Sequence, residues 1–347
     1  LIASDNVTEG DVLLLEEGIY FQTVNVTKGF IRIVAKGPGV IFDGNSILLT
    51  AFTLSDVTGV AVEEIKIRHF RASGILILSG SGNRILNNKF NNMLGSGIQL
   101  SSSSSNLIWK NEICNCTNGV TFTFGSPNNW LIENIIKECS GSAFQHFSSF
   151  DSNNVFISNI AIRSGNSGLN ILGNNNLLLY NLLLDNGLGI VIDQGNNSVA
   201  IGNTIKGTKS NAQSILNEYR NYFAGENRIE CNTRIGIQNF SQFGMFLDNE
   251  ILYNSDIGMQ LTTSSAENLV MDNKLVCNIP ENIVDNGTDN NLINNIDKPC
   301  EPCKAPSDFC NPCRGESDNR FDESCSKTFK TKSRTCHRHL KERDSST

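Results

Sequence analysis

The C-terminal segment carries the clearest pattern of reactive side chains in this sequence. Cys300, Cys303, Cys310 and Cys313 form a C-x2-C-x6-C-x2-C pattern. Four thiolates at such spacings can hold zinc, although the spacer in the middle is shorter than in common zinc ribbons. The alternative is oxidation, because a short exported segment rich in cysteine forms disulfides within one chain or between chains. We favour disulfides over a metal site.

Carboxylates are the second source of possible chemistry. Glycoside hydrolysis needs two carboxyl groups about 5 to 10 Å apart, one as acid and one as nucleophile or base. A series of glycines recurs along the chain, and Asp193 is the lone carboxylate among the positions two and four residues after them in the central part. Asp193 is therefore a weak catalytic candidate for which the sequence indicates no partner.

Uncharged polar side chains dominate those same positions. They include Gln99, Thr121, Gln145, Asn170, Gln238 and Gln260. Amides and hydroxyls suit sugar hydroxyls, and weak repeated contacts add through multivalency. The segment 211–227 is unusually aromatic, and Tyr219 and Tyr222 are candidates for a sugar platform, with the shielding of a wider turn as the simpler interpretation.

An internal repeat must position these residues. Asparagine recurs every 22 to 25 residues in the same local setting, and most copies are followed eight or nine residues later by a glycine. Short alternating runs with polar turns between them predict a solenoid with about three short strands per coil. Buried turn asparagines would then bond to one another along the stack. The predicted ladder contains Asn88, Asn111, Asn134, Asn159, Asn181, Asn203, Asn227, Asn249, Asn273 and Asn295.

On these repeats, roughly residues 1 to 298 resemble the right-handed parallel β-helix family, which includes pectin-lyase-like and NosD-like proteins. The resemblance implies an all-β fold in which the glycine opens the first strand and the asparagine lies between the second and third strands. It also implies that catalysis in the enzymatic members takes place on the outer face of the first strand. The chain lacks the NTD, DD, GHG and RIK signatures of polygalacturonases and the arginine cluster of pectate lyases.

The repeat and the cysteines divide the chain into three parts. Residues 1–60 are predicted to form the N-terminal cap and first coils, 61–298 the regular coils, and 299–347 a cysteine-rich tail. Cys116 and Cys139 occupy the same position in adjacent coils, about 5 Å apart by stacking, so we expect them to form a disulfide. His146 is expected to point inward and to hydrogen-bond to a stacked neighbour. Arg68 and His69 are expected on a solvated turn.

Composition limits the partners and the compartment. The net charge of −7 argues against nucleic acid, because phosphate binding needs a basic stripe that the repeats lack. The chain has no run of 18 apolar residues, so no transmembrane segment is expected. The cysteines fit a secreted or cell-surface location.

Together these patterns predict a structural or adhesive β-helix that binds a polysaccharide or cell-surface glycan and self-associates through its tail cysteines. The alternative is a polysaccharide lyase, hydrolase or epimerase acting on the outer face of the first strand. No cofactor is expected, with calcium or zinc as the alternative.

Overall fold

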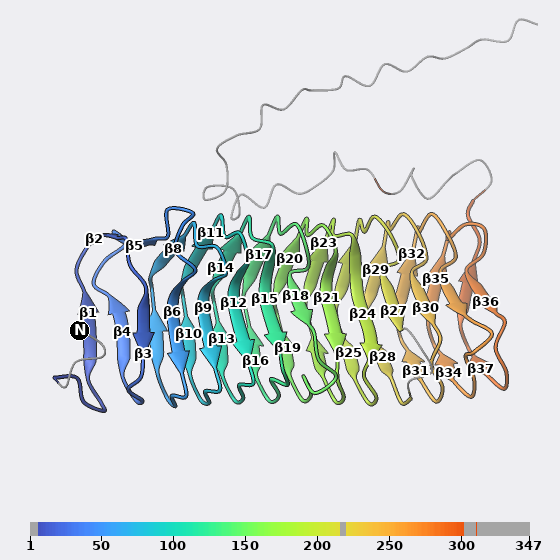
Figure 1. Cartoon of the computed structure of the whole chain (residues 1–347). Helices are drawn as coiled ribbons and strands as arrows, with labels where there is room; N and C mark the ends of the chain where they lie inside the picture. The colour runs from blue at the N-terminus through green and yellow to red at the C-terminus, as the bar shows by residue number, and fades with distance from the viewer. Residues whose placement is uncertain (1–5, 216–219, 302–309, 311–347) are drawn as a thin grey trace, which may run out of the picture. The chain divides into compact units, whose positions relative to one another are not determined.

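The computed structural model describes residues 6–215, 220–301 and 310 (Figure 1). Every strand pair among them is parallel, and the described residues contain no helix. Three strands make one coil, and coils follow one another from β1 to β38 in three sheets of 13, 13 and 12 strands. The all-β solenoid with three short strands per coil is confirmed.

Each sheet takes one strand from every coil. Sheet A contains β1 (Val12–Leu15), β4 (Arg32–Ala35), β7 (Ala61–Glu63), β10 (Arg84–Leu86), β13 (Leu107–Trp109), β16 (Trp130–Ile132), β19 (Val155–Ile157), β22 (Leu177–Leu179), β25 (Val199–Ile201), β28 (Phe223–Gly225), β31 (Met245–Leu247), β34 (Leu269–Met271) and β37 (Asn291–Ile293). Sheet B contains β2 (Gly18–Tyr20), β5 (Val40–Asp43), β8 (Lys66–Arg68), β11 (Lys89–Asn91), β14 (Glu112–Cys114), β17 (Ile135–Lys137), β20 (Ile160–Ile162), β23 (Leu182–Leu184), β26 (Thr204–Lys206), β29 (Arg228–Glu230), β32 (Glu250–Leu252), β35 (Lys274–Val276) and β38 (Ile296–Lys298). Sheet C contains β3 (Val24–Val26), β6 (Thr50–Ser55), β9 (Ser73–Leu78), β12 (Ser96–Ser101), β15 (Asn118–Thr123), β18 (Phe144–His146), β21 (Ser167–Leu172), β24 (Leu188–Gln194), β27 (Gln213–Ile215), β30 (Ile237–Asn239), β33 (Met259–Leu261) and β36 (Ile283–Asp285).

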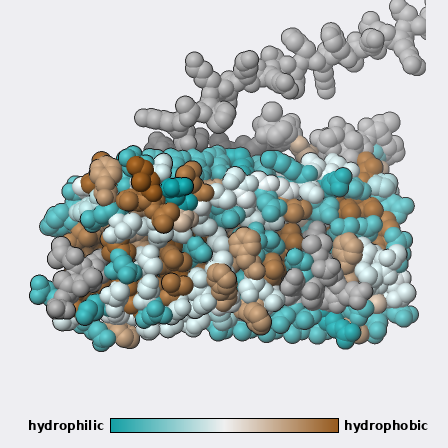
Figure 2. Space-filling model, viewed as in Figure 1, coloured by the Kyte–Doolittle hydropathy of each residue, from teal (hydrophilic) through white to brown (hydrophobic). Residues whose placement is uncertain are grey.

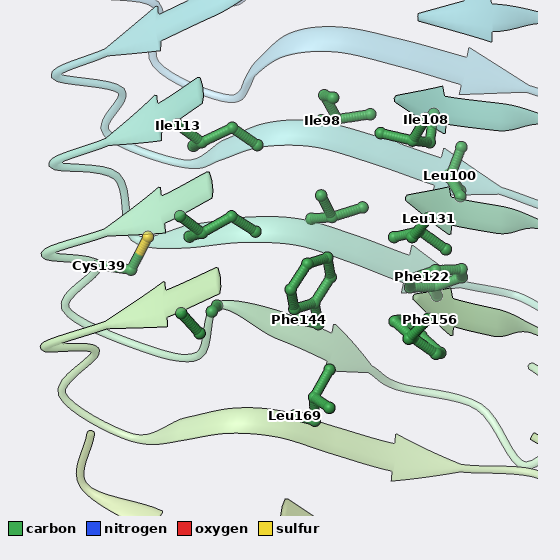
Figure 3. Close-up of a cluster of buried hydrophobic side chains, with 14 of the residues drawn as sticks. Ile98, Leu100, Ile108, Ile113, Phe122, Leu131, Cys139, Phe144, Phe156 and Leu169 are labelled. Atoms are coloured by element: carbon green, nitrogen blue, oxygen red, sulfur yellow. The ribbon is translucent and has the colours of Figure 1, made fainter. Parts of the chain in front are cut away.

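The core consists of columns of apolar side chains, because in-register stacking places equivalent residues of successive coils on top of one another. The register of sheet C makes one column of Ile98, Val120, Phe144, Leu169 and Ile190. Sheet B makes another of Phe90, Ile113, Ile136, Ala161 and Leu183. Figure 3 shows members of both columns pointing into the space between the sheets. The members of both columns are buried, so apolar side chains occupy the interior of these coils.

The turn between sheets A and B repeats a two-residue device. The first residue adopts a left-handed conformation, with φ between +52° and +56° at nine non-glycine positions and +63° at Gly202. The second residue is the asparagine predicted from the repeat, which is buried from Asn88 to Asn273 and half-buried at Asn295. In a typical rung, the amide of Asn181 donates to the Phe156 carbonyl at 3.0 Å and to Asn203 Oδ1 at 2.9 Å. The ladder runs without a break from Asn88 to Asn295.

Two further ladders, which were not predicted from the sequence, stabilise the other turns. Five residues before the first ladder, Asn83, Asn106, Asn129, Asn154 and Asn176 bond in series between sheets C and A. Five residues after it, Asn232, Asn254 and Asn278 bond in series between sheets B and C. In the sequence, the constant spacing of five residues from the first ladder identifies both of them. All three corners of the solenoid therefore satisfy buried backbone amides with side-chain amides.

Cys116 and Cys139 occupy this third column and are free buried thiols, so the predicted disulfide between them is wrong. In-register stacking separates equivalent side chains by about 4.8 Å, whereas the Cβ atoms of a disulfide lie about 3.5 to 4.5 Å apart. Each sulfur instead contacts a carbonyl of its own turn, Cys116 with Cys114 at 3.4 Å and Cys139 with Lys137 at 4.0 Å. Burial raises the pKa of the Cys139 thiol to about 12, so it stays protonated.

The segment after β38 is attached to the solenoid by disulfides. Cys300 bonds to Cys277, and Cys310 bonds to Cys231. Cys277 and Cys231 directly follow β35 and β29, so both bonds lie at the end of sheet B strands. Cys114, the last residue of β14, is also disulfide-bonded. Of the predicted tail, residues 299–301 and 310 are described, and the remainder lies outside the described residues.

Two thiols of the predicted zinc pattern are therefore not available as ligands, which contradicts a four-cysteine metal site. Cys303 and Cys313 lie outside the described residues. The described part of the chain has no cluster of three or more His, Cys, Asp or Glu side chains that would hold a metal ion. It also lacks a helical segment with the length and hydrophobicity of a transmembrane span.

Candidate functional site

The register of sheet C brings the predicted sugar-contacting residues into one outward column. Gln99 pairs with Thr121, Thr121 with Gln145, and Gln145 with Asn170. Further along the same sheet, Gln238 pairs with Gln260. The side chains face outward because they alternate with the buried column that begins at Ile98. A single repeat position thus forms two stretches of amides and hydroxyls, which the apolar Val191 separates.

Hydrogen bonds within the protein occupy some of the side-chain donors and acceptors of this column. Ser73 Oγ donates to Gln99 Oε1 at 3.0 Å, and Gln238 Nε2 donates to Gln260 Oε1 at 2.9 Å. An amide has two donor hydrogens and two acceptor lone pairs, so one such bond leaves groups for a ligand. The side chains are held in place by their neighbours, which lowers the entropy that a ligand must remove on binding.

Solvent exposure reduces the number of predicted sugar-contacting residues that a ligand can reach. Thr121 is 4% exposed and Gln145 is 8% exposed, so neither presents its side chain to a polymer. Both are already bonded, Thr121 to Ser96 Oγ at 2.6 Å and Gln145 to the His146 carbonyl at 2.7 Å. The half-buried members of the column are Gln99, Asn170, Gln238 and Gln260.

The predicted tyrosine platform is wrong for Tyr222. Its side chain is 1% exposed and lies in the core, where Gln213 Nε2 donates to its hydroxyl. A buried tyrosine needs a partner for its hydroxyl, and Gln213, itself buried, supplies one. Tyr219 lies outside the described residues.

Asp193 lies near the end of β24 and is half-buried. The strands on both sides place no carboxylate in register with β24: β21 contributes Asn170 and Leu172, and β27 contributes Gln213, Ser214 and Ile215. A register shift next to Leu172 interrupts the ladder at this point. The residues that pair with β24 therefore have amide, hydroxyl or apolar side chains. Two-carboxylate chemistry would need a second carboxylate from elsewhere in the structure.

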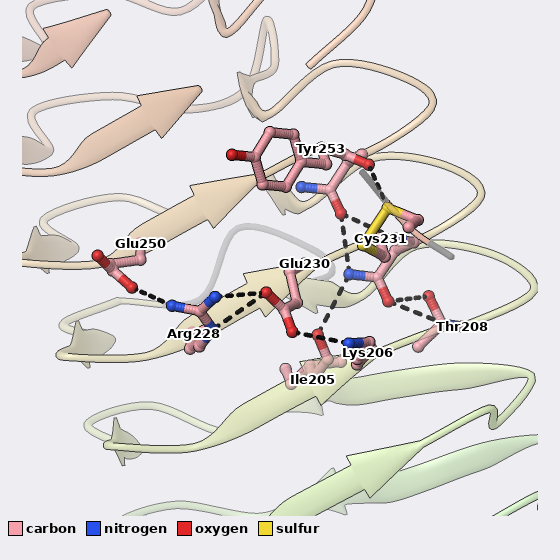
Figure 4. A network of polar contacts seen from close by, with 11 residues as sticks. Ile205, Lys206, Thr208, Arg228, Glu230, Cys231, Glu250 and Tyr253 are labelled. Atoms are coloured by element: carbon pink, nitrogen blue, oxygen red, sulfur yellow. Dashed lines mark hydrogen bonds and ion pairs between the residues drawn. A yellow bond between two sulfur atoms is a disulfide. The ribbon is translucent and has the colours of Figure 1, made fainter. Parts of the chain in front are cut away.

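Charged side chains gather on sheet B, where they neutralise one another. Glu230 accepts from Lys206 at 3.1 Å and from Arg228, which also pairs with Glu250 (Figure 4). Lys274 completes the line by contacting Glu250 at 2.9 Å. Burial alone would raise the pKa of Glu230, but the bonds from Arg228 and Lys206 outweigh it and lower that pKa. These charges stabilise the stack rather than form an open cationic site.

Asp43 organises a second polar cluster near the start of the solenoid. Its carboxylate is 6% exposed and accepts from the Asn45 N–H at 2.9 Å, from Arg68 Nε at 2.8 Å and from His69 Nδ1 at 3.0 Å. Burial raises the pKa of Asp43, but these hydrogen bonds have the larger combined effect and lower it. Through Asp43, the last residue of β5, Arg68 and His69 thus attach the start of the turn between β8 and β9 to β5.

His146 lies on sheet C but points inward, as expected from the sequence. It is fully buried between Phe122 and Phe156, with ring centroids 4.3 Å and 5.7 Å away, and its Nδ1 bonds the Leu172 carbonyl at 2.7 Å. This bond assigns the proton to Nδ1. Burial lowers the pKa of His146 to about 4, partly opposed by the bond to Leu172, so the ring is neutral at pH 7. It serves the core and not catalysis.

The buried imidazole predicts a pH dependence of stability. The unfolded chain binds a proton at a pKa of about 6.5, and the folded chain only near 4. Between these values the unfolded state holds more protons, so lowering the pH through this window should remove about 3 kcal/mol of the free energy of unfolding. Urea unfolding of wild type and of His146→Phe at pH 7, 5.5 and 4 checks this. Relative to His146→Phe, the free energy of unfolding of wild type should fall by that amount between pH 7 and pH 4. A difference between the two proteins that stays constant with pH would contradict a neutral buried His146.

Comparison with known proteins agrees with this geometry. The family model described as "Right handed beta helix region" matches residues 18–181. The protein is a right-handed parallel β-helix. The matched region spans β2 to β22 and includes the first five asparagines of the ladder, while the same register continues to β38. A search of curated protein sequences finds no significant match.

Solved β-helix structures are similar to this one in fold. A PL6 family polysaccharide lyase from Pseudopedobacter saltans superposes with a TM-score of 0.68 at 13% identity, covering 86% of this chain and 90% of the lyase. The Streptococcus pneumoniae surface protein and adhesin PfbA gives a TM-score of 0.54 at 11% identity, covering 83% and 90%. A PL6 alginate lyase in complex with a trisaccharide gives 0.51 at 12% identity, covering 86% and 84%. At such identities the likeness shows the fold alone.

Proposed function

We propose that this β-helix is an extracellular protein that binds polysaccharide along the outward face of sheet C and does not cleave it. The observation that supports this most directly is the composition of the column from Gln99 to Gln260, which offers amides without an in-register carboxylate next to Asp193. Sugar hydroxyls form hydrogen bonds with such groups in both directions. The binding uses no metal ion or other cofactor.

Two observations support an extracellular, adhesive role. Disulfides such as Cys231–Cys310 form and persist mainly in oxidising compartments. Related folds include the pneumococcal adhesin, a surface protein. Repeated weak contacts along a rigid face suit attachment to a polymer, because each additional contact raises the overall affinity. A further role in linking chains would depend on the cysteines that lie outside the described residues.

The second candidate function is polysaccharide cleavage, which the fold of the PL6 lyases favours. In that case Asp193 would contribute to the active site. Catalysis would produce new chain ends from polygalacturonate, alginate or another polymer, and Asp193→Asn would abolish their production. The binding proposal instead expects that neither wild type nor Asp193→Asn shortens the polymer.

The binding proposal predicts retardation of the protein in native gels that contain polysaccharide. Gln238→Ala/Gln260→Ala should reduce the retardation several-fold, because it removes two adjacent bonded amides from the sheet C column. Gln22→Ala is a matched control, since Gln22 is an exposed amide in the turn after β2. Equal retardation of the double variant and wild type would contradict binding at this face. Absence of retardation by any polysaccharide would contradict the function itself.

A further inference from the structure

Three phenylalanine rings stand out on the surface of adjacent coils. Phe124 is 79% exposed, Phe147 is 60% exposed and Phe150 is 76% exposed. They belong to the turns that follow β15 and β18. Most of the largest fully buried side chains of this protein are phenylalanines, so the fold has inward positions for such rings and does not use them here. Along the face in Figure 2, hydrophobic surface recurs between hydrophilic residues.

The backbone brings the three residues together. The N–H of Phe147 donates to the Phe122 carbonyl at 3.1 Å, which sets Phe147 beside the end of β15. Phe150 lies over Gly125, where a Cβ would meet the Phe150 Cβ at 3.1 Å. Gly125 directly follows Phe124, so the three side chains form one surface, which we call the aromatic patch.

A buried carboxylate fixes the shape of the aromatic patch. Asp151 is 0% exposed and accepts from the backbone N–H groups of Ser126 at 2.7 Å, Ser148 at 3.0 Å and Phe147 at 3.3 Å. Ser126 belongs to the turn after β15 and the other two to the turn after β18, so Asp151 joins the two turns that carry the rings. A fixed loop loses little conformational entropy when a ligand binds.

The chemistry around the rings favours an uncharged ligand with hydroxyl groups. Residues 117–132 and 139–150 contain no Lys, Arg, Asp or Glu. The exposed and half-exposed polar side chains there are hydroxyls and amides, among them Ser148, Ser149 and Asn128. A pyranose ring has an apolar C–H face that packs on an aromatic ring and hydroxyls at its edge that bond to such groups. An anionic polymer would need cations, and these two segments supply none.

We infer that the aromatic patch is a binding site for neutral pyranose polysaccharides, with sugar rings packed on Phe124, Phe147 and Phe150. Phe147 follows β18 on the outward face of sheet C, so the patch continues the amide column and would bind the same chain. This inference rests on the proposed glycan-binding function and specifies its ligand class. Packing against a second copy of this protein is the competing use of the patch.

Affinity electrophoresis with defined polymers tests the inference. Amylose, galactomannan and xyloglucan are the neutral probes, and alginate and polygalacturonate are the anionic ones. Wild type should be retarded by at least one neutral polymer and not by the anionic ones. Phe124→Ala/Phe147→Ala/Phe150→Ala should weaken that binding about tenfold or more, because truncated anchor residues dominate losses of affinity. The corresponding triple tyrosine variant keeps the rings and should retain binding.

The control removes aromatic rings elsewhere on the solenoid. Phe21→Ala/Tyr180→Ala takes away two side chains that are 64% and 59% exposed and should leave binding unchanged. Circular dichroism and urea midpoints confirm that each variant is folded. The retention of binding by the tyrosine variant separates the role of the rings from a folding defect in the alanine variant.

The remaining outcomes overturn either the binding site, the ligand class or the proposed function. Binding of a neutral polymer that is equal in wild type and the triple alanine variant would overturn the aromatic patch and leave the proposed function intact. Retardation by alginate as strong as by neutral polymers would overturn the ligand class. Failure of wild type to bind any polymer would overturn both proposals. Dimers in sedimentation experiments that the triple alanine variant abolishes, without glycan binding, would assign the patch to contact between copies.

Discussion

Replacing Asn181 with leucine is expected to lower the free energy of unfolding by about 3 to 5 kcal/mol. Asn181 Oδ1 accepts from both the backbone N–H and the side chain of Asn159, at 3.0 Å each. The Asn181 amide in turn donates to the Phe156 carbonyl and to Asn203. Leucine removes these partners in a fully buried turn and admits no water in their place. Each orphaned buried group costs about 1 to 3 kcal/mol.

Urea unfolding monitored by circular dichroism measures this loss. Asn174→Leu is the matched control, because Asn174 is an exposed asparagine one coil corner away and accepts a single exposed bond from Asn196. Its effect should remain within about 0.5 kcal/mol, as for most surface substitutions. Similar midpoints for Asn181→Leu and wild type would show that the ladder does not stabilise the turns.

Removing the disulfide between Cys231 and Cys310 should have an effect of similar size. The bond joins residues 79 apart in the sequence, so in the chain-entropy description it stabilises the fold by about 4.5 kcal/mol. Cys231→Ser/Cys310→Ser should lose most of that. The loss should be slightly smaller than this value, because Cys277–Cys300 already shortens the same loop and the two contributions do not add.

Comparing urea midpoints with and without reductant checks this prediction. Wild type should lose stability in reductant, and the double serine variant should lose less because one of its bonds is already absent. Substitution of the free buried Cys139 by alanine is a control that leaves the reductant effect unchanged. If wild type instead formed reductant-sensitive multimers and the variant kept its midpoint, these cysteines would link different chains, as the cross-linking hypothesis requires.

The sequence was sufficient to predict the solenoid and the first ladder because both depend on a local pattern that recurs. Each coil repeats one asparagine and one glycine at nearly constant spacing, and parallel stacking must place equivalent residues above one another. Ile65 stands where the first ladder would begin, and its N–H indeed bonds to Asn88 Oδ1 at 3.0 Å. The outward column of sheet C followed from the same alternation.

Only the tertiary structure decided which side chains are accessible and which cysteines pair. Thr121, Gln145 and Tyr222 have the polarity of surface residues, but their burial depends on turn geometry and on neighbouring coils. Cys310 pairs with Cys231, from which it is separated by 79 residues, and no local spacing encodes that pairing. The aromatic patch likewise arises where Asp151 joins two turns that are separated in the sequence. A repeat determines what stacks, because stacking acts between equivalent positions, whereas contacts between non-equivalent positions depend on the whole path of the chain.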